Sequence, residues 1–249
     1  MSGYQSFASF YDALMMDADY EGRADIFDRA IKRNSKIEAK TLLDVASGTG
    51  NVTFSMHNKG YDITAVDLSE DMLSVAFGKA MEKEITDILF LCQDMTMLDL
   101  NDTVDAAICA LDGINHLCED KDVRAAFQRI ALFLKKGGVF VFDANTVYKH
   151  QCVLANNCFR YDLEEIFCIW QNSLYADNIV GMEIDIFQKL HGGDYRRYSD
   201  YLEERAYEKE FFISVGEEAG LEFIECFDEK TEKEPTDKSE RVYYVFRKK

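Results

Sequence analysis

Hydrophobic residues recur along the first 145 positions at two spacings, and each spacing predicts a different element. Spacings of three and four residues are typical of one face of a helix. Between 119 and 136, for example, Val123, Phe127, Ile130 and Leu134 are separated by four, three and four residues. Helices are predicted over 4–16, 20–34, 51–59, 69–83 and 119–136, and short apolar runs predict buried strands over 61–66, 88–92, 104–111 and 139–142. The alternation of strands and helices predicts an α/β fold.

After residue 145 the pattern becomes strand-like. Met182, Ile184 and Ile186 alternate with more polar neighbours, as in a sheet with one covered face. Strand-like segments over 165–170, 179–190 and 195–207 are separated by turns at 177–178 and 191–193, which predicts an antiparallel insert. A last helix over 208–219 and strands over 221–227 and 242–246 follow. We therefore expect three parts: a core with a helical cap over 1–148, the insert over 149–207, and a closing segment over 208–249.

A strand, a glycine-rich turn and a helix follow one another between 42 and 59. Two apolar residues lead into Asp44, and the small residues Ala46, Gly48 and Gly50 let a ligand approach bare backbone. The start of the following helix offers unpaired N–H groups and a partial positive charge. The turn is therefore the leading candidate for a ligand site.

The ligand is predicted from the acidic residues around this turn. A dinucleotide fingerprint needs a third glycine, and Thr53 stands in that place. Asp44 would repel a pyrophosphate but can hold an ammonium group. Asp67 ends the next strand, 17 residues after Gly50, near the spacing at which an acid meets ribose hydroxyls. These features predict a positively charged nucleoside ligand, and S-adenosylmethionine fits because it joins an adenosine to a sulfonium and an amino acid.

The segment 42–53 resembles motif I of the class I S-adenosylmethionine-dependent methyltransferases, and Val66-Asp67-Leu68-Ser69 resembles their acidic second motif. Ala46 stands where many members have glycine, and its small side chain is compatible with binding. The resemblance implies a Rossmann-like seven-strand methyltransferase sheet with helices on both faces and the antiparallel β insert as a lid. It implies that S-adenosylmethionine, and its product S-adenosylhomocysteine, are bound by Asp44, Ala46, Ser47, Gly48, Gly50, Asp67, Leu68, Met72, Asp94, Met95 and Ala110.

Three residues are candidates for the acceptor side of the site. The segment around Tyr11 resembles the N-terminal cap of small-molecule methyltransferases, in which such a tyrosine lies over cofactor and substrate. His116 follows the strand over 104–111 and can accept a proton, and Trp170 can line a substrate cavity. The alternatives are a core tyrosine, a hydrogen-bonded histidine at a helix start, and a packing tryptophan. In a similar segment of one small-molecule subgroup, histidine often stands where Leu202 stands here, so an inherited role at that position is in doubt.

Composition indicates which substrate classes and which cellular compartment suit the protein. The formal net charge of −18 argues against a nucleic-acid substrate, because phosphates are held by clustered Lys and Arg. No apolar run approaches the roughly 20 residues of a membrane helix. The first six residues lack the basic and apolar regions of a signal peptide, so we expect a cytoplasmic protein. The seven cysteines form no C-x-x-C pair and are expected to be free core thiols, with no metal site.

The function predicted from these features is methyl transfer from S-adenosylmethionine to a small-molecule acceptor, at nitrogen or oxygen. The Asn-Pro-Pro-Tyr tetrapeptide of DNA adenine methyltransferases is absent after the strand over 104–111, which disfavours that activity. Two alternatives stay open. One is a catalytically silent methyltransferase fold that binds cofactor or a partner, and the other is a nicotinamide-dependent reductase, which Asp44 and Thr53 disfavour. The sequence leaves the acceptor and the oligomeric state open.

Overall fold

The computed structural model describes residues 4–249, with side chains from residue 7 onward. Residues 1–3, which belong to the N-terminal segment considered above for targeting, lie outside the described residues. The helices are α1 (Tyr4–Leu14), α2 (Tyr20–Asn34), α3 (Asn51–His57), α4 (Glu70–Glu82), α5 (Asp120–Phe133) and α6 (Lys209–Glu218). Short helical turns are η1 (Met95–Met97), η2 (Gly113–His116), η3 (Lys149–Leu154) and η4 (Ala176–Asn178).

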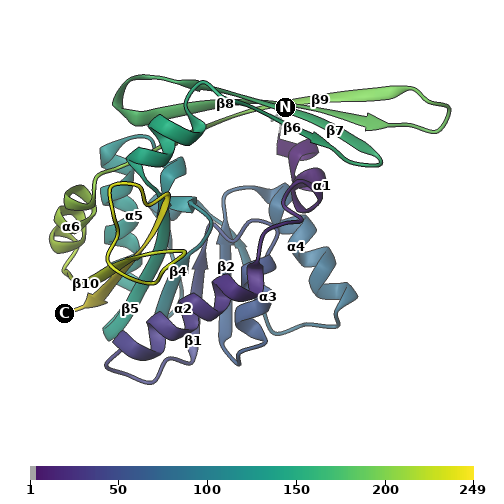
Figure 1. The fold of residues 1–249 in the computed structure, drawn as a ribbon. Helices are drawn as coiled ribbons and strands as arrows, with labels where there is room; N and C mark the ends of the chain where they lie inside the picture. Colours follow the sequence, from purple (N-terminus) through teal and green to yellow (C-terminus); the bar gives the residue numbers. More distant parts are fainter. Residues whose placement is uncertain (1–3) are drawn as a thin grey trace.

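A seven-stranded sheet forms the base of the molecule, in the order β10-β11-β5-β4-β1-β2-β3 (Figure 1). Its strands are β1 (Thr41–Val45), β2 (Asp62–Asp67), β3 (Leu89–Cys92), β4 (Val104–Cys109), β5 (Leu134–Asn145), β10 (Leu221–Asp228) and β11 (Arg241–Lys248). The first five strands are parallel, whereas β11 is antiparallel to both β5 and β10. The strand order reverses between β1 and β4, so their carboxyl ends open a crevice where ligands bind in such sheets.

Both faces of this sheet are covered by helices. Successive side chains of each strand point to opposite sides, so each strand contributes to the core on both faces. In β5, Phe140 and Phe142 pack with α5 and α6, whereas Val139 and Val141 pack with α2 and α3. Phe127 of α5 lies edge-on to Phe140 and Phe142, with ring centroids 5.4 and 5.5 Å away. The α/β fold with helices on both faces is confirmed.

A second, antiparallel sheet lies across the upper end of the first in Figure 1, in the order β6-β7-β8-β9. Its strands are β6 (Cys158–Asp162), β7 (Ile166–Leu174), β8 (Ile179–Lys189) and β9 (Tyr195–Arg205). Apolar side chains such as Ile184 and Ile186 pack with Phe7 and Phe10 of α1. The predicted antiparallel insert is confirmed, and α1 lies between it and the core.

The prediction of a helix over 119–136 is wrong at its end. α5 ends at Phe133, and Leu134 already pairs with Val104 in the ladder between β5 and β4. Lys135 donates to Asp105 Oδ1 at 2.8 Å, and Gly137 adopts φ +84° where the register shifts. The helical spacing therefore continues into a strand, because a long-range ladder and a charge pair decide the boundary.

Two further expectations differ from the structure. The strand β6 was not predicted, because it is short and three of its five residues are exposed. The seven cysteines are free thiols, but Cys92, Cys152 and Cys158 are exposed rather than in the core. No helix among the described residues is long and apolar enough to cross a membrane.

Candidate cofactor and acceptor site

The turn between β1 and α3 winds through three left-handed residues. Ala46, Gly48 and Gly50 have φ of 56°, 55° and 81°. For Ala46 this conformation costs about 1–2 kcal/mol, which glycine would not incur. The next N–H, from Ser47, donates to the Val66 carbonyl of β2 at 3.0 Å and ties the turn to the neighbouring strand. A Cβ built on Gly48 would meet nothing within 4 Å, so backbone there is open to a ligand.

Asp44 lies buried at the carboxyl end of β1. Its Oδ2 accepts a hydrogen bond from Thr53 Oγ1 at 2.6 Å, and its Oδ1 has no partner among the described residues. Burial raises the pKa of Asp44 to about 7. The hydrogen bond from Thr53 acts in the opposite direction, and the nearby charge of Asp67 adds to the increase. A buried unpartnered carboxylate oxygen is costly in a complete site, so this atom fits a cationic ligand group.

Asp67 ends β2 and holds the turn from the other side. Its Oδ2 accepts from the Gly48 N–H at 2.7 Å and its Oδ1 accepts from the Ser69 N–H at 2.9 Å. Burial raises the pKa of Asp67 despite these two backbone donors. Each carboxylate oxygen can accept more than one hydrogen bond, so Asp67 can organise the turn and still receive hydroxyl donors.

A cavity of about 1110 Å³ opens above this turn and runs toward the second sheet. All the predicted site residues except Gly50 line it: Tyr11, Asp44, Ala46, Ser47, Gly48, Asp67, Leu68, Met72, Asp94, Met95, Ala110, His116 and Trp170. Gly50 instead faces Phe54 and Ala76, where a Cβ would come within 3.1 and 3.2 Å. Gly50 therefore serves the packing of the turn, and its predicted contact with cofactor lacks support from its position.

The loop after β3 forms one end of the cavity. Asp94 Oδ1 accepts from the N–H and the hydroxyl of Thr96, each at 2.8 Å, and so caps η1. Leu68 lies 70% exposed beside it, whereas Met72 is buried on the first turn of α4. The predicted contacts of these residues with the cofactor stay predictions.

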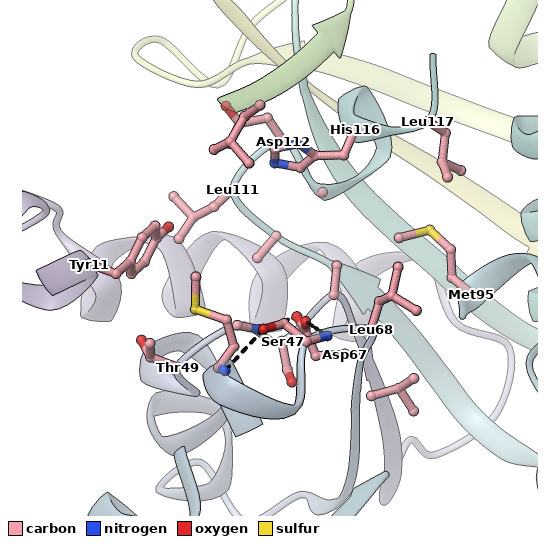
Figure 2. A pocket seen from close by; sticks show the side chains of 18 of the residues that line it. Tyr11, Ser47, Thr49, Asp67, Leu68, Met95, Leu111, Asp112, His116 and Leu117 are labelled. Atoms are coloured by element: carbon pink, nitrogen blue, oxygen red, sulfur yellow. Dashed lines mark hydrogen bonds between the residues drawn. The ribbon is translucent and has the colours of Figure 1, made fainter. Parts of the chain in front are cut away.

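The opposite side of the cavity is built from α1, η2 and the second sheet. Figure 2 shows Tyr11, Leu111, Asp112 and His116 facing Ser47 and Asp67 across the cavity. Tyr11 is half-buried, and burial raises the pKa of its phenol, so the hydroxyl stays protonated. Trp170 lines the cavity but also lies edge-on to Phe7 at 6.3 Å. Leu202 is buried beside them.

Asp12 is a residue of this region that sequence reasoning missed. Its Oδ1 accepts from Thr49 Oγ1 at 2.6 Å and Asn51 Nδ2 at 2.8 Å, and its Oδ2 accepts from Lys79 Nζ at 2.8 Å. Burial works against the charge, but the Lys79 and Thr49 hydrogen bonds outweigh it and lower the pKa of Asp12. Asp12 thus fastens α1 to the glycine-rich turn and to α4, and the only signal was its position after Tyr11.

A buried charge cluster supports the loop after β4 and was also missed. Leu111 and Asp112 are left-handed, with φ of 55° and 58°. Asp143 Oδ1 accepts from the Leu111 N–H at 2.7 Å. Arg241 of β11 pairs with Asp143 and donates to both oxygens of Asp112 at 3.2 Å. Burial disfavours all these charges, but their mutual attraction lowers the pKa of Asp112 and raises that of Arg241.

A family model described as a methyltransferase domain matches residues 42–138. A relative in Geobacillus sp. (strain WCH70) is 33% identical over 246 residues, which is 98% of this chain and 99% of the relative. The crystal structure of an S-adenosylmethionine-dependent methyltransferase from Clostridium acetobutylicum ATCC 824 is 34% identical, covers 98% of both chains and superposes with a TM-score of 0.86. The chain belongs to the S-adenosylmethionine-dependent methyltransferases.

This membership settles the cofactor of the methyltransferase, which is S-adenosylmethionine, and sets the nicotinamide alternative aside. The cavity fits that cofactor, because Asp44 Oδ1 is buried without a partner and the backbone at Gly48 is open. The glycine/sarcosine N-methyltransferase of Parasynechococcus marenigrum is 31% identical over 143 residues, which is 56% of this chain and 49% of that relative. The likeness to that enzyme thus extends over about half of each protein.

Proposed function

We propose that this methyltransferase methylates an amine nitrogen of a small cationic molecule that carries neither a phosphate nor a carboxylate group. The observation that carries the proposal is the charge of the cavity. Among its described lining residues there is no Lys or Arg, and the only titratable nitrogen belongs to His116. The acidic lining residues are Asp44, Asp67, Glu70, Asp71, Asp94, Asp112, Glu119, Asp122, Glu203 and Glu204. Such a lining attracts cations and repels anions.

The carboxylates divide by position into two groups. Those at the carboxyl ends of β1 and β2 and in the segments that follow β2 and β3 lie on the side proposed for the cofactor, where Asp44 suits its ammonium and Asp67 its ribose. On the other side, Asp112 is neutralised by Arg241, whereas Glu119, Glu203 and Glu204 have no arginine or lysine beside them in the cavity lining. These three remain available for a cationic acceptor. The glycine/sarcosine relative supports nitrogen as the methylated atom, although the acidic lining argues against an amino acid here.

S-adenosylmethionine supplies an activated methyl group when bound. The chain then has to hold the acceptor nitrogen in line, exclude water and take up the proton of an ammonium group. The second sheet contributes Trp170 and Leu202 as apolar cover, and His116 and Glu204 face the cavity as hydrogen-bond acceptors for an ammonium. Because methyl transfer needs little further chemistry, a conspicuous catalytic dyad is unnecessary.

The proposal is tested by offering the purified protein S-adenosylmethionine and matched acceptors, with methylated product measured by mass spectrometry. Diamines and amino sugars are expected to gain methyl groups, whereas the same molecules with the amine replaced by hydroxyl, or with an added phosphate or carboxylate, are not. Equal kcat/KM for alcohols or for anionic amines would overturn the proposal. Binding of S-adenosylhomocysteine with no turnover across all acceptors would favour the catalytically silent fold.

Affinity for S-adenosylhomocysteine is expected to rise with pH. The Asp44 pKa of about 7 means that the carboxyl is half protonated near neutrality. The ligand ammonium favours the ionised form, so binding releases a proton, and the dissociation constant falls about 10-fold between roughly pH 6 and 8. Isothermal titration across this range measures the change, and Asp44→Asn should bind with a flat pH dependence. Equal affinities of the unaltered protein at both ends of the range would contradict the assignment of Asp44.

A further inference from the structure

Glu204 of β9 lies between two histidines and connects the cavity to the protein interior. Its Oε1 is 4.0 Å from Nε2 of His116, which lines the cavity. Its Oε2 accepts from Asn145 Nδ2 at 2.9 Å and lies 3.6 Å from Nε2 of His150. Glu204 itself is only 6% exposed, yet it lines the cavity, and His150 is fully buried behind it. The Glu204 carboxylate therefore lies between the cavity and the buried imidazole of His150.

The hydrogen bonds of His150 fix its tautomer. Its Nδ1 lies 2.8 Å from the carbonyl oxygen of Asn178, which can only accept, so Nδ1 carries a proton. In the neutral ring Nε2 is then a bare lone pair, and it is buried with no hydrogen-bond partner. The lone pair faces a carboxylate that is also an acceptor. One added proton would turn this unfavourable pair of acceptors into a hydrogen bond.

The charged groups around Glu204 do not balance one another. The buried carboxylates Asp143 and Glu204 and the partly buried Asp112 lie around two cations, Arg241 and Lys149. This arrangement leaves one negative charge without a cation, and buried charges are stabilised by pairing. Glu229 and Arg23, on the far side of Arg241, form an ion pair and leave the balance unchanged.

We infer that Glu204 and His150 together take up the proton that the acceptor ammonium loses, with Glu204 as the catalytic residue and His150 as its positioning partner. The inference rests on the proposed amine methylation. The ammonium N–H bond breaks, its electron pair stays on nitrogen, and the proton passes to the Glu204 carboxylate. Rotation about the terminal bond of this side chain, which is soft, presents the proton to His150 Nε2. His116 remains a hydrogen-bond acceptor at the rim.

Kinetics of two variants of the full chain test this pair. Glu204→Gln keeps an oxygen for Asn145 but removes the base, so kcat should fall about 10²-fold or more. His150→Asn keeps a donor for the Asn178 carbonyl and removes Nε2. Because an imidazole is ordinarily a stronger base than a carboxylate, its loss should lower the plateau of kcat and move the acid limb of the pH profile to lower pH. Unchanged kcat in Glu204→Gln, or an unmoved acid limb in His150→Asn, would overturn the inference.

The other titratable or charged groups facing the pair are His116 from η2, Lys149 from η3, Cys118 after η2, and Glu203 on β9, with Asp112 behind Asn145. These groups are present in all the variants, so a moved limb reports on the altered residue. The matched controls are Glu183→Gln on the outer face of β8 and His191→Asn in the following turn, both outside the cavity lining. Both should keep the kcat and pH profile of the unaltered protein.

A measurement that needs no acceptor separates this inference from the proposed function. Nitrogen-15 spectra of the imidazoles in the protein bound to S-adenosylhomocysteine identify the His150 signals by their absence in His150→Asn. The Nε2 signal is expected to shift in Glu204→Gln while the signals of His57 and His191 stay in place. An unshifted Nε2 signal would overturn the proposed pairing of Glu204 with His150. If His150→Asn does not fold, the His150 signals are assigned instead through the carbon atoms bonded to the ring nitrogens, and the same outcome applies. A shifted signal without turnover of any amine would instead count against the proposed function.

Discussion

Arg241→Met is expected to lower the free energy of unfolding by about 3–5 kcal/mol, which is the cost of leaving buried carboxylates without their cation. Arg241 is 8% exposed, pairs with the fully buried Asp143, and donates to both oxygens of Asp112. No other arginine or lysine among the described residues forms a salt bridge with these two carboxylates. Chemical denaturation measured by circular dichroism gives the change.

The matched control is Arg29→Met. Arg29 is half exposed and pairs with Glu232 at 2.6 Å on the surface, where such ion pairs contribute about 0–1 kcal/mol. A loss for Arg241→Met no larger than that of Arg29→Met would contradict the view that this cluster anchors the loop after β4. The same loop carries two left-handed residues, so cofactor affinity should also fall in Arg241→Met under conditions where it is folded.

Asp67→Ala is expected to weaken binding of S-adenosylhomocysteine by roughly 1.5–3 kcal/mol, the worth of hydrogen bonds to a charged group. The variant removes the proposed acceptor for the ribose hydroxyls. It also releases the Gly48 N–H, which Asp67 Oδ2 holds at 2.7 Å. Isothermal titration measures the affinity, and circular dichroism confirms that the variant is folded.

Asp62→Ala is the control for this variant, because Asp62 lies at the exposed start of the same strand β2 and away from the cavity. Its affinity should equal that of the unaltered protein. A folded Asp67→Ala variant that binds S-adenosylhomocysteine as tightly as Asp62→Ala would remove Asp67 from the cofactor site.

The core fold could be predicted from the sequence because its signals are local. Apolar runs and helical spacings gave the parallel strands and their helices, and the turn from Asp44 to Gly50 has a recognisable composition. The end of α5 could not be predicted, since a lysine that suits a helix end instead pairs with Asp105 from β4. The strand β6 has no apolar run, and only its ladder with β7 makes it a strand.

The two sides of the cavity also differ in how far their residues could be predicted from the sequence. Residues around the glycine-rich turn are close in sequence and could be named in advance. Glu204 meets His150 across 54 positions and Asn145 across 59, and no spacing announces such contacts. Gly50 shows a different limit, because a glycine within a binding motif can also be required by packing, here against Phe54 and Ala76.

The second sheet is one continuous stretch of chain, leaving the core after β5 and returning before α6. It supplies Trp170, Leu202 and Glu204 to the cavity, whereas every residue proposed for the cofactor lies between 44 and 110. This segment can therefore be replaced or altered without changing the residues proposed to bind the cofactor. Acceptor recognition and methyl-donor recognition are thus encoded in separate stretches of the chain, so substitutions between 158 and 205 can change the acceptor while the donor site is kept.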